Sequence, residues 1–219
     1  MASHGKYRFL DLPRHIRDDT YQKVLVVAHP LYLFKDSHSL SVDLFAPEAR
    51  PRRLALLFTN RQLHAEASAI LYHLNHFTFV DTTPSQGNVV QSFLDRVGPV
   101  NAAHLSHLSI NFPAADSRDG RAVLREADSR ALGLLREQCA GLATLELLVQ
   151  QGNSRGLTAP SQAQESSSSF ARDALAQVDT QLRAFPLLRK IIVRFYSGSP
   201  TPEVVELMQG YGWVILNGR

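Results

Sequence analysis

The sequence predicts an α/β fold in which strands and helices alternate to build a mostly parallel sheet. The first observation behind this prediction is that strand-like runs rich in apolar and β-branched residues alternate with longer helix-like runs in the second half of the chain. In chain order these are residues 105–112 (strand), 120–139 (helix), 142–149 (strand), 170–185 (helix), 187–195 (strand), 201–209 (helix) and 213–216 (strand). Strands joined by helices of this length imply right-handed βαβ crossovers.

The second observation is a pattern shared by the starts of three predicted strands, Leu-x-x-Leu or Ile-x-hydrophobic, which is typical of a leucine-rich repeat. Leu105, Leu142 and Leu187 begin these strands. The spacing between them is irregular, so the repeat is degenerate. We therefore expect a leucine-rich-repeat-like sheet in which each strand and helix packs against its neighbours.

The composition is that of a globular protein without stabilising cross-links. The chain has 219 residues, of which 44% are hydrophobic and 20% charged, and its single cysteine, Cys139, excludes an intrachain disulfide. This fits a reducing compartment, and we expect the cytoplasm or the nucleus. We expect no secretory signal and no membrane span, because no apolar stretch approaches the roughly 20 residues that a spanning helix needs. The net charge of +3, from 23 Lys and Arg against 20 Asp and Glu, is too small to indicate a nucleic-acid partner.

The N-terminal part is predicted to form a helix and a β-hairpin. Residues 9–13 are an apolar lead-in that ends at Pro13, a residue well suited to the first turn of a helix. A helix is expected over residues 14–28 and is stopped by His29-Pro30. Residues 31–34 and 40–44 then have strand character, with turn residues between them, and predict the hairpin.

Residues 54–80 are predicted to form one long central helix that runs into a strand. Apolar residues recur at helical spacing along one face. They are Leu56, Leu63, Ala67, Ile70, Leu71 and Leu74. Asn75 is expected to close this helix in a left-handed conformation. Phe77 and Phe79 give the following segment its strand character, and we expect it to be the first strand of the sheet.

Further along, residues 87–97 predict a helix that ends at Gly98-Pro99. Residues 150–169 are rich in Ser, Gln and Gly and predict a flexible insertion at the edge of the sheet. We divide the chain into an N-terminal segment, 1–53, and an α/β leucine-rich-like domain, 54–219, which together make one continuous fold.

Three segments resemble a large fungal family of F-box-like proteins, most of them functionally uncharacterised. The opening Phe9-Leu10-Asp11-Leu12-Pro13, continued by Ile16-Arg17 and Tyr21, is similar to the family's F-L-x-L-P-x-E-I-R-x-x-I-Y. Residues 56–79 are similar to its L-L-x-x-C-R-Q-I-x-x-E-A-x-x-I-L-Y-x-x-N-x-F-x-F, and residues 93–108 to its F-L-x-x-I-G-x-x-N pattern. The resemblance covers roughly the first half of the chain.

The resemblance implies a protein-interaction module that serves as a substrate-recognition adaptor of a ubiquitin ligase. In that case Leu10, Leu12, Pro13 and Ile16 would bind the ligase adaptor Skp1. Alternatively these residues only cap the core, and the protein is a binding scaffold that recognises a protein or small ligand through loops at the strand ends. Residues 31–53 separate the two hypotheses, since a helical segment there favours the F-box and a hairpin favours the scaffold.

The sequence gives no catalytic motif and indicates no cofactor. We interpret Arg61, Glu66, Tyr72 and Asn75 as structural residues. We expect hydrogen bonds of Arg61 and Glu66 to fix the central helix against the hairpin or the Phe77 strand. The pairs His73-x-x-His76 and His104-x-x-His107 have a chelating spacing, but no Cys, Asp or Glu lies close to them in the sequence. We therefore expect no metal site. Cys139 lacks a recognisable His partner, which argues against a nucleophilic role.

Overall fold

A seven-stranded sheet forms the centre of the molecule, and six of its strands are parallel. The computed structural model describes residues 8–35, 42–47, 52–80, 86–158 and 167–218. Within them the strand order is β2-β1-β3-β4-β7-β8-β9. The strands are β1 (Leu31–Phe34), β2 (Asp43–Phe45), β3 (His76–Phe79), β4 (His107–Asn111), β7 (Thr144–Val149), β8 (Lys190–Phe195) and β9 (Val214–Asn217). The predicted α/β class with a mostly parallel sheet is confirmed.

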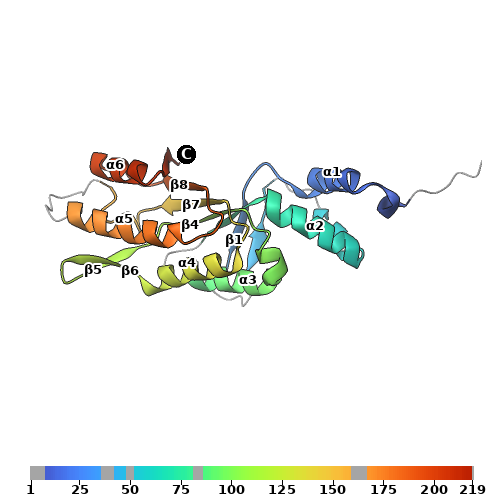
Figure 1. The fold of residues 1–219 in the computed structure, drawn as a ribbon, viewed down its shortest axis with the longest axis horizontal. Helices are drawn as coiled ribbons and strands as arrows, with labels where there is room; N and C mark the ends of the chain where they lie inside the picture. Colours follow the sequence, from blue (N-terminus) through green and yellow to red (C-terminus); the bar gives the residue numbers. More distant parts are fainter. Residues whose placement is uncertain (1–7, 36–41, 48–51, 81–85, 159–166, 219) are drawn as a thin grey trace, which may run out of the picture.

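The strands are connected by helices whose positions agree with the predicted alternation (Figure 1). The helical segments are η1 (Phe9–Asp11), α1 (Arg14–Leu25), η2 (Arg53–Phe58), α2 (Arg61–Leu74), α3 (Gln86–Ala102), α4 (Glu126–Gln138), α5 (Ser167–Arg183) and α6 (Pro202–Gly210), where η denotes a 3-10 helix. No helix in the described part of the chain is long and apolar enough to cross a membrane.

The helices α3 to α6 all pack on one face of the sheet. From β3 to β9 each parallel strand lies beside the previous one in chain order, so successive right-handed crossovers fall on the same side. The main core confirms this arrangement, because strand residues such as Ile110, Leu145 and Val193 belong to one buried cluster with residues of all four helices. The helix residues in that cluster include Phe93, Leu94, Leu132, Leu135, Leu175, Val178, Val204 and Met208.

A second, smaller core joins η1, α1, η2 and α2. Tyr21 and Leu25 from α1 pack against Leu63, Ala67 and Leu71 from α2. This helical unit lies beyond the β1 end of the sheet, opposite the end where α5 and α6 lie (Figure 1). The hairpin belongs to the sheet itself, since β1 pairs antiparallel with β2 and parallel with β3. The division at residue 53 stays a prediction.

The predicted long central helix is wrong, because the chain breaks between η2 and α2. The Asn60 side chain accepts a hydrogen bond from the Leu63 amide at 3.0 Å and caps the start of α2. Asn75 at the other end is also not left-handed, since its φ is −93° and its backbone is extended. The strand that follows, β3, is an interior strand rather than the first one, as β1 and β2 precede it in the sheet.

The predicted helix over residues 120–139 is wrong at its start, because an antiparallel hairpin occupies that position. Strands β5 (Ala115–Arg118) and β6 (Arg121–Leu124) pair with each other and not with the main sheet. Asp119 and Gly120 form the turn with φ values of 51° and 78°. Two successive residues with positive φ are characteristic of a type I′ hairpin turn.

Smaller differences concern two other helix ends. Helix α1 stops at Leu25, three residues earlier than predicted. The Asn75 side-chain amide donates a hydrogen bond to the Leu25 carbonyl at this end of the helix. At Gly98, whose φ of 75° is not helical, the helix that begins at Gln86 ends as predicted, and the difference is that a second short helical turn continues from Pro99 to Ala102. Pro99 fits there because the first turn of a helical segment needs no amide donor.

Part of the segment predicted as a flexible insertion is bonded to the sheet. The Asn153 side chain donates hydrogen bonds to the carbonyls of Phe112 and Leu148 at 3.0 and 2.9 Å, and Leu157 is buried. Residues 167–169 belong to α5. Residues 159–166 lie outside the described residues, and the flexibility of the insertion stays a prediction.

Candidate functional site on the open face of the sheet

The face of the sheet opposite α3 to α6 carries a line of polar side chains, and we call it the open face. Its position follows from strand alternation, since residues two apart point to the same side. His76 is paired in register with His107, and Ser109 with Glu146. The open face is formed by Tyr32, His76, Thr78, His107, Ser109, Glu146, Arg194 and Tyr196. None of these residues belongs to the main apolar core.

Two histidines are stacked at the centre of the open face. The rings of His76 and His107 lie parallel, with centroids 3.7 Å apart and 3° between their planes. His76 Nε2 lies 2.6 Å from the Ser109 hydroxyl oxygen, within hydrogen-bond distance. Burial, and then the neighbouring His107, lower the pKa of His76, so its imidazole is neutral at pH 7.

A buried carboxylate lies next to the histidines. Glu146 is 6% exposed, and its Oε1 lies 3.2 Å from His107 Nε2. Its other oxygen, Oε2, accepts hydrogen bonds from Arg194 Nε at 3.2 Å and Nη2 at 3.1 Å. Burial acts to raise the pKa of Glu146, but the His107 hydrogen bond, the His76 imidazole once it is protonated at acidic pH and the charge of Arg194 outweigh it and lower the pKa. The carboxylate is therefore ionised and held by fixed donors on both oxygens.

Exposed aromatic side chains surround this polar centre. Tyr196 is 50% exposed at the end of β8, and Phe45 is 56% exposed on β2, 6.4 Å from the ring of Tyr32. Burial is the main cause that raises the pKa of Tyr196, and the nearby Glu146 and Tyr32 raise it further. These exposed rings lie on strands on either side of the His76, His107 and Glu146 cluster.

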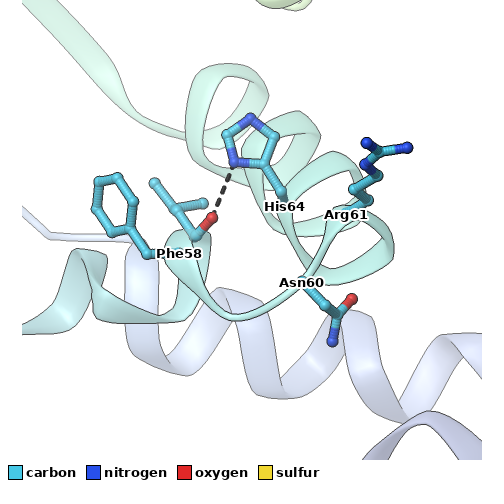
Figure 2. Close-up of a pocket in the computed structure, with 5 residues that line it drawn as sticks. Phe58, Asn60, Arg61 and His64 are labelled. Atoms are coloured by element: carbon cyan, nitrogen blue, oxygen red, sulfur yellow. Dashed lines mark hydrogen bonds between the residues drawn. The ribbon is translucent and has the colours of Figure 1, made fainter.

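A second surface feature lies at the corner between η2 and α2. Figure 2 shows Phe58, Asn60, Arg61 and His64 around a shallow hollow of about 350 Å³, which Leu57 also lines. His64 Nδ1 lies 2.9 Å from the Leu57 carbonyl oxygen, and Phe58 is 84% exposed. The Arg61 guanidinium points away from the imidazole in Figure 2. None of the described residues that line the hollow is an Asp or a Glu, whereas the open face groups a carboxylate with two histidines.

The four residues predicted to be structural do not act together. Arg61 is exposed at the start of α2, whereas Glu66 is buried and bonded to α1 through Arg17 and Tyr21, not to the hairpin or to β3. Tyr72 stacks on Phe77 with centroids 5.8 Å apart. The Asn75 side chain accepts from the Val27 amide and donates to the Leu25 and Leu71 carbonyls, which ties the end of α1 to the end of α2.

The residues proposed to bind an adaptor lie at the opposite end of the molecule from α5 and α6. Leu10 and Leu12 are half-buried, and their carbonyls accept hydrogen bonds from Arg17 Nη1. Pro13 and Ile16 are exposed at the start of α1. Adaptor binding by this surface stays a prediction.

Sequence analysis did not find the cluster on the open face. No metal-binding or acidic residue lies near either histidine pair along the chain, because Glu146 and Arg194 are contributed by other strands, β7 and β8. A signal was present in the strand alternation, because His76-x-Thr78, His107-x-Ser109 and Thr144-x-Glu146 place polar residues on one side of strands whose other residues are apolar. Register between the strands was needed to bring these residues together.

Together, the fold and the site define a class: an α/β protein with a one-sided parallel sheet whose uncovered face carries a polar cluster within an aromatic rim. No protein-family model matches the chain, and no curated protein or solved structure is significantly similar to it.

Proposed function

We propose that this chain is a non-enzymatic binding module whose open face recognises a protein partner. The observation that carries the proposal is the open face, where a polar centre held by hydrogen bonds lies between the exposed side chains of Phe45 and Tyr196. The hairpin of β1 and β2 favours this scaffold hypothesis over an F-box, because residues 31–53 include paired strands where the F-box hypothesis requires helix.

The side chains on the open face are of the types that dominate protein interfaces. Tyr and Arg supply large contact areas and are enriched among the residues that contribute most to binding. Arg194 and Glu146 compensate each other's charge, so this surface lacks the strong positive charge that a nucleic-acid or anionic membrane surface would favour. We propose a protein partner in the cytoplasm or the nucleus, where the unpaired Cys139 is stable.

Proximity labelling in the native host tests this proposal with two double variants, each of which truncates two exposed apolar side chains to alanine. Tyr196→Ala combined with Phe45→Ala removes the exposed aromatic rim, and we expect the specifically labelled proteins to be lost. Val100→Ala combined with Leu187→Ala, at exposed positions away from the open face, should leave labelling unchanged. Labelling that is the same for the open-face variant and the wild type would contradict the proposal.

A second candidate function is the ubiquitin-ligase adaptor implied by the resemblance. The observation in its favour is that Pro13 and Ile16 are exposed on the helical unit of α1 and α2, where they are available to a partner. A pull-down with purified Skp1, with an established F-box protein as a positive control, tests it. Binding that is abolished by Ile16→Asp supports the adaptor, and no binding by the wild-type chain excludes it.

A further inference from the structure

We propose that His76, His107 and Glu146 form a binding site for a single Zn²⁺ ion on the open face. One potential ligand atom from each of these residues lies within 4.8 Å of the other two. They come from three adjacent strands, β3, β4 and β7, so the rigid sheet fixes the spacing of their backbones. This site goes beyond the proposed protein-binding function and does not depend on it.

The ligand set indicates the class of metal. Two imidazoles and one carboxylate suit Zn²⁺ and its neighbours among the first-row transition metals, whereas Mg²⁺ and Ca²⁺ prefer sites made of oxygen ligands alone. Tetrahedral bonds of about 2.0–2.2 Å place ligand atoms roughly 3.4 Å apart. His107 Nε2 and Glu146 Oε1 are already 3.2 Å apart, so His76 is the ligand that must approach.

His76 can approach by turning its ring. The two imidazole rings now lie in separate parallel planes, and because each nitrogen lone pair lies in the plane of its ring, the two cannot both be aimed at one ion. Rotation of His76 about its terminal side-chain bond replaces the contact of Nε2 with the Ser109 hydroxyl by a bond to the metal. Both histidines are only partly buried, which leaves room for this rotation.

Neighbouring residues already hold the carboxylate in a suitable orientation. Arg194 donates both of its hydrogen bonds to Oε2, which leaves Oε1 facing the histidines. Outer contacts of this kind orient the ligands of metal sites in proteins. Three protein ligands leave a fourth position directed toward the open face, where water or a side chain of another molecule completes the coordination.

Zinc titration of the purified full-length chain tests the site, with Mg²⁺ as the negative control. We expect the wild-type chain to bind one Zn²⁺ ion, and we expect this binding to be weakened when a ligand residue is substituted. His76→Ala, His107→Ala and Glu146→Gln should each weaken binding by at least about 100-fold, since loss of an outer contact alone typically costs 10–100-fold. Co²⁺ in place of Zn²⁺ provides a second readout, because tetrahedral Co²⁺ has characteristic visible absorption.

The chain itself offers matched controls in the other members of the two histidine pairs. His73→Ala and His104→Ala remove imidazoles three residues from the proposed ligands and should leave the affinity unchanged. Circular dichroism verifies that each variant is folded, and the near-isosteric Glu146→Gln serves if an alanine variant unfolds. No zinc binding by the wild type, equal binding by Glu146→Gln, or an equal loss in the control variants would overturn the site.

Discussion

Arg17 and Glu66, 49 residues apart in the sequence, form a two-point ion pair that joins α1 to α2. Arg17 Nε donates to Glu66 Oε2 at 2.8 Å, and Nη2 donates to Oε1 at 2.7 Å. The Tyr21 hydroxyl also donates to Oε2 at 2.8 Å, and Gln62 donates to Oε1 at 3.0 Å. Both oxygens of the buried Glu66 carboxylate therefore accept hydrogen bonds from donors that lie on α1 and α2.

Glu66→Ala should destabilise the protein, because it leaves Arg17 and Tyr21 buried without their acceptor. We expect the melting temperature to fall by roughly 5 °C, measured by thermal denaturation. Lys23→Ala breaks the exposed pair between Lys23 and Asp19 within α1 and should change the melting temperature by less than about 2 °C. Equal shifts for the two variants would show that the buried pair has no special role.

Stability should decrease at acidic pH through the same carboxylate. The hydrogen bond from Arg17 is the main cause that lowers the pKa of Glu66 to about 2, from its ordinary value of 4.5. Between these pH values the unfolded state therefore binds more protons than the folded state. The contribution of Glu66 to the free energy of unfolding is fully present above about pH 4.5 and is lost as the pH falls toward 2. Urea denaturation of the wild type and Glu66→Gln should show a flatter pH dependence for the variant in this range. The dependence should not vanish, because the pKa of Glu146 is lowered too.

Two glycines should respond in opposite directions to substitution by alanine. Gly120 has a φ of 78° in the turn between β5 and β6, so Gly120→Ala should destabilise the protein by about 1 kcal/mol. Gly133 lies inside α4, and an added Cβ there meets no atom within 4 Å. Gly133→Ala should therefore stabilise by roughly 0.5–1 kcal/mol. Chemical denaturation gives both values, and changes of the same sign would contradict the assigned conformations.

Asn75→Ala should destabilise the junction between α1 and α2. The substitution leaves the Val27 amide and the Leu25 and Leu71 carbonyls without their present partner. Buried polar groups left without partners cost about 1–3 kcal/mol, and we expect a loss of this size in chemical denaturation. Asn88→Ala, at an exposed position of α3, is the control and should change stability by less than about 0.5 kcal/mol.

Cys139 should report global unfolding. It is 1% exposed, and burial raises the pKa of its thiol to about 12, so it is both inaccessible and protonated in the native state. A thiol-reactive dye should label the native protein slowly and label it rapidly in denaturant. Fast native labelling would mean that the end of α4 opens locally.

The fold could be predicted further from the sequence than the site. Strands such as β7 and β8 are recognisable because consecutive apolar residues are flanked by helices of regular length. The break before α2 was missed because the apolar spacing continues across it, although Asn60 is a strong N-cap residue. The hairpin of β5 and β6 was also missed, and there the signal was local, since Asp119-Gly120 is a favoured dipeptide for a two-residue hairpin turn.

The site could not be predicted because it depends on register between strands. His76 and His107 are 31 positions apart, and Arg194 lies 48 positions beyond Glu146. A shift of one residue in any pairing would turn one of these side chains to the opposite face. The sequence shows which residues are polar within a strand, but only the pairing of the strands shows which of them meet.

The chain-order arrangement of the parallel strands also has a consequence for synthesis on the ribosome. From β3 onward each new strand pairs with one that has already emerged, so no part of the sheet must wait for a distant C-terminal segment. Each pairing of this kind closes one strand-helix-strand unit, as between Ser109 and Glu146, rather than the whole chain. The nascent chain can therefore bury its apolar surface one strand and helix at a time, which limits the time during which aggregation-prone folding intermediates expose apolar surface to other proteins.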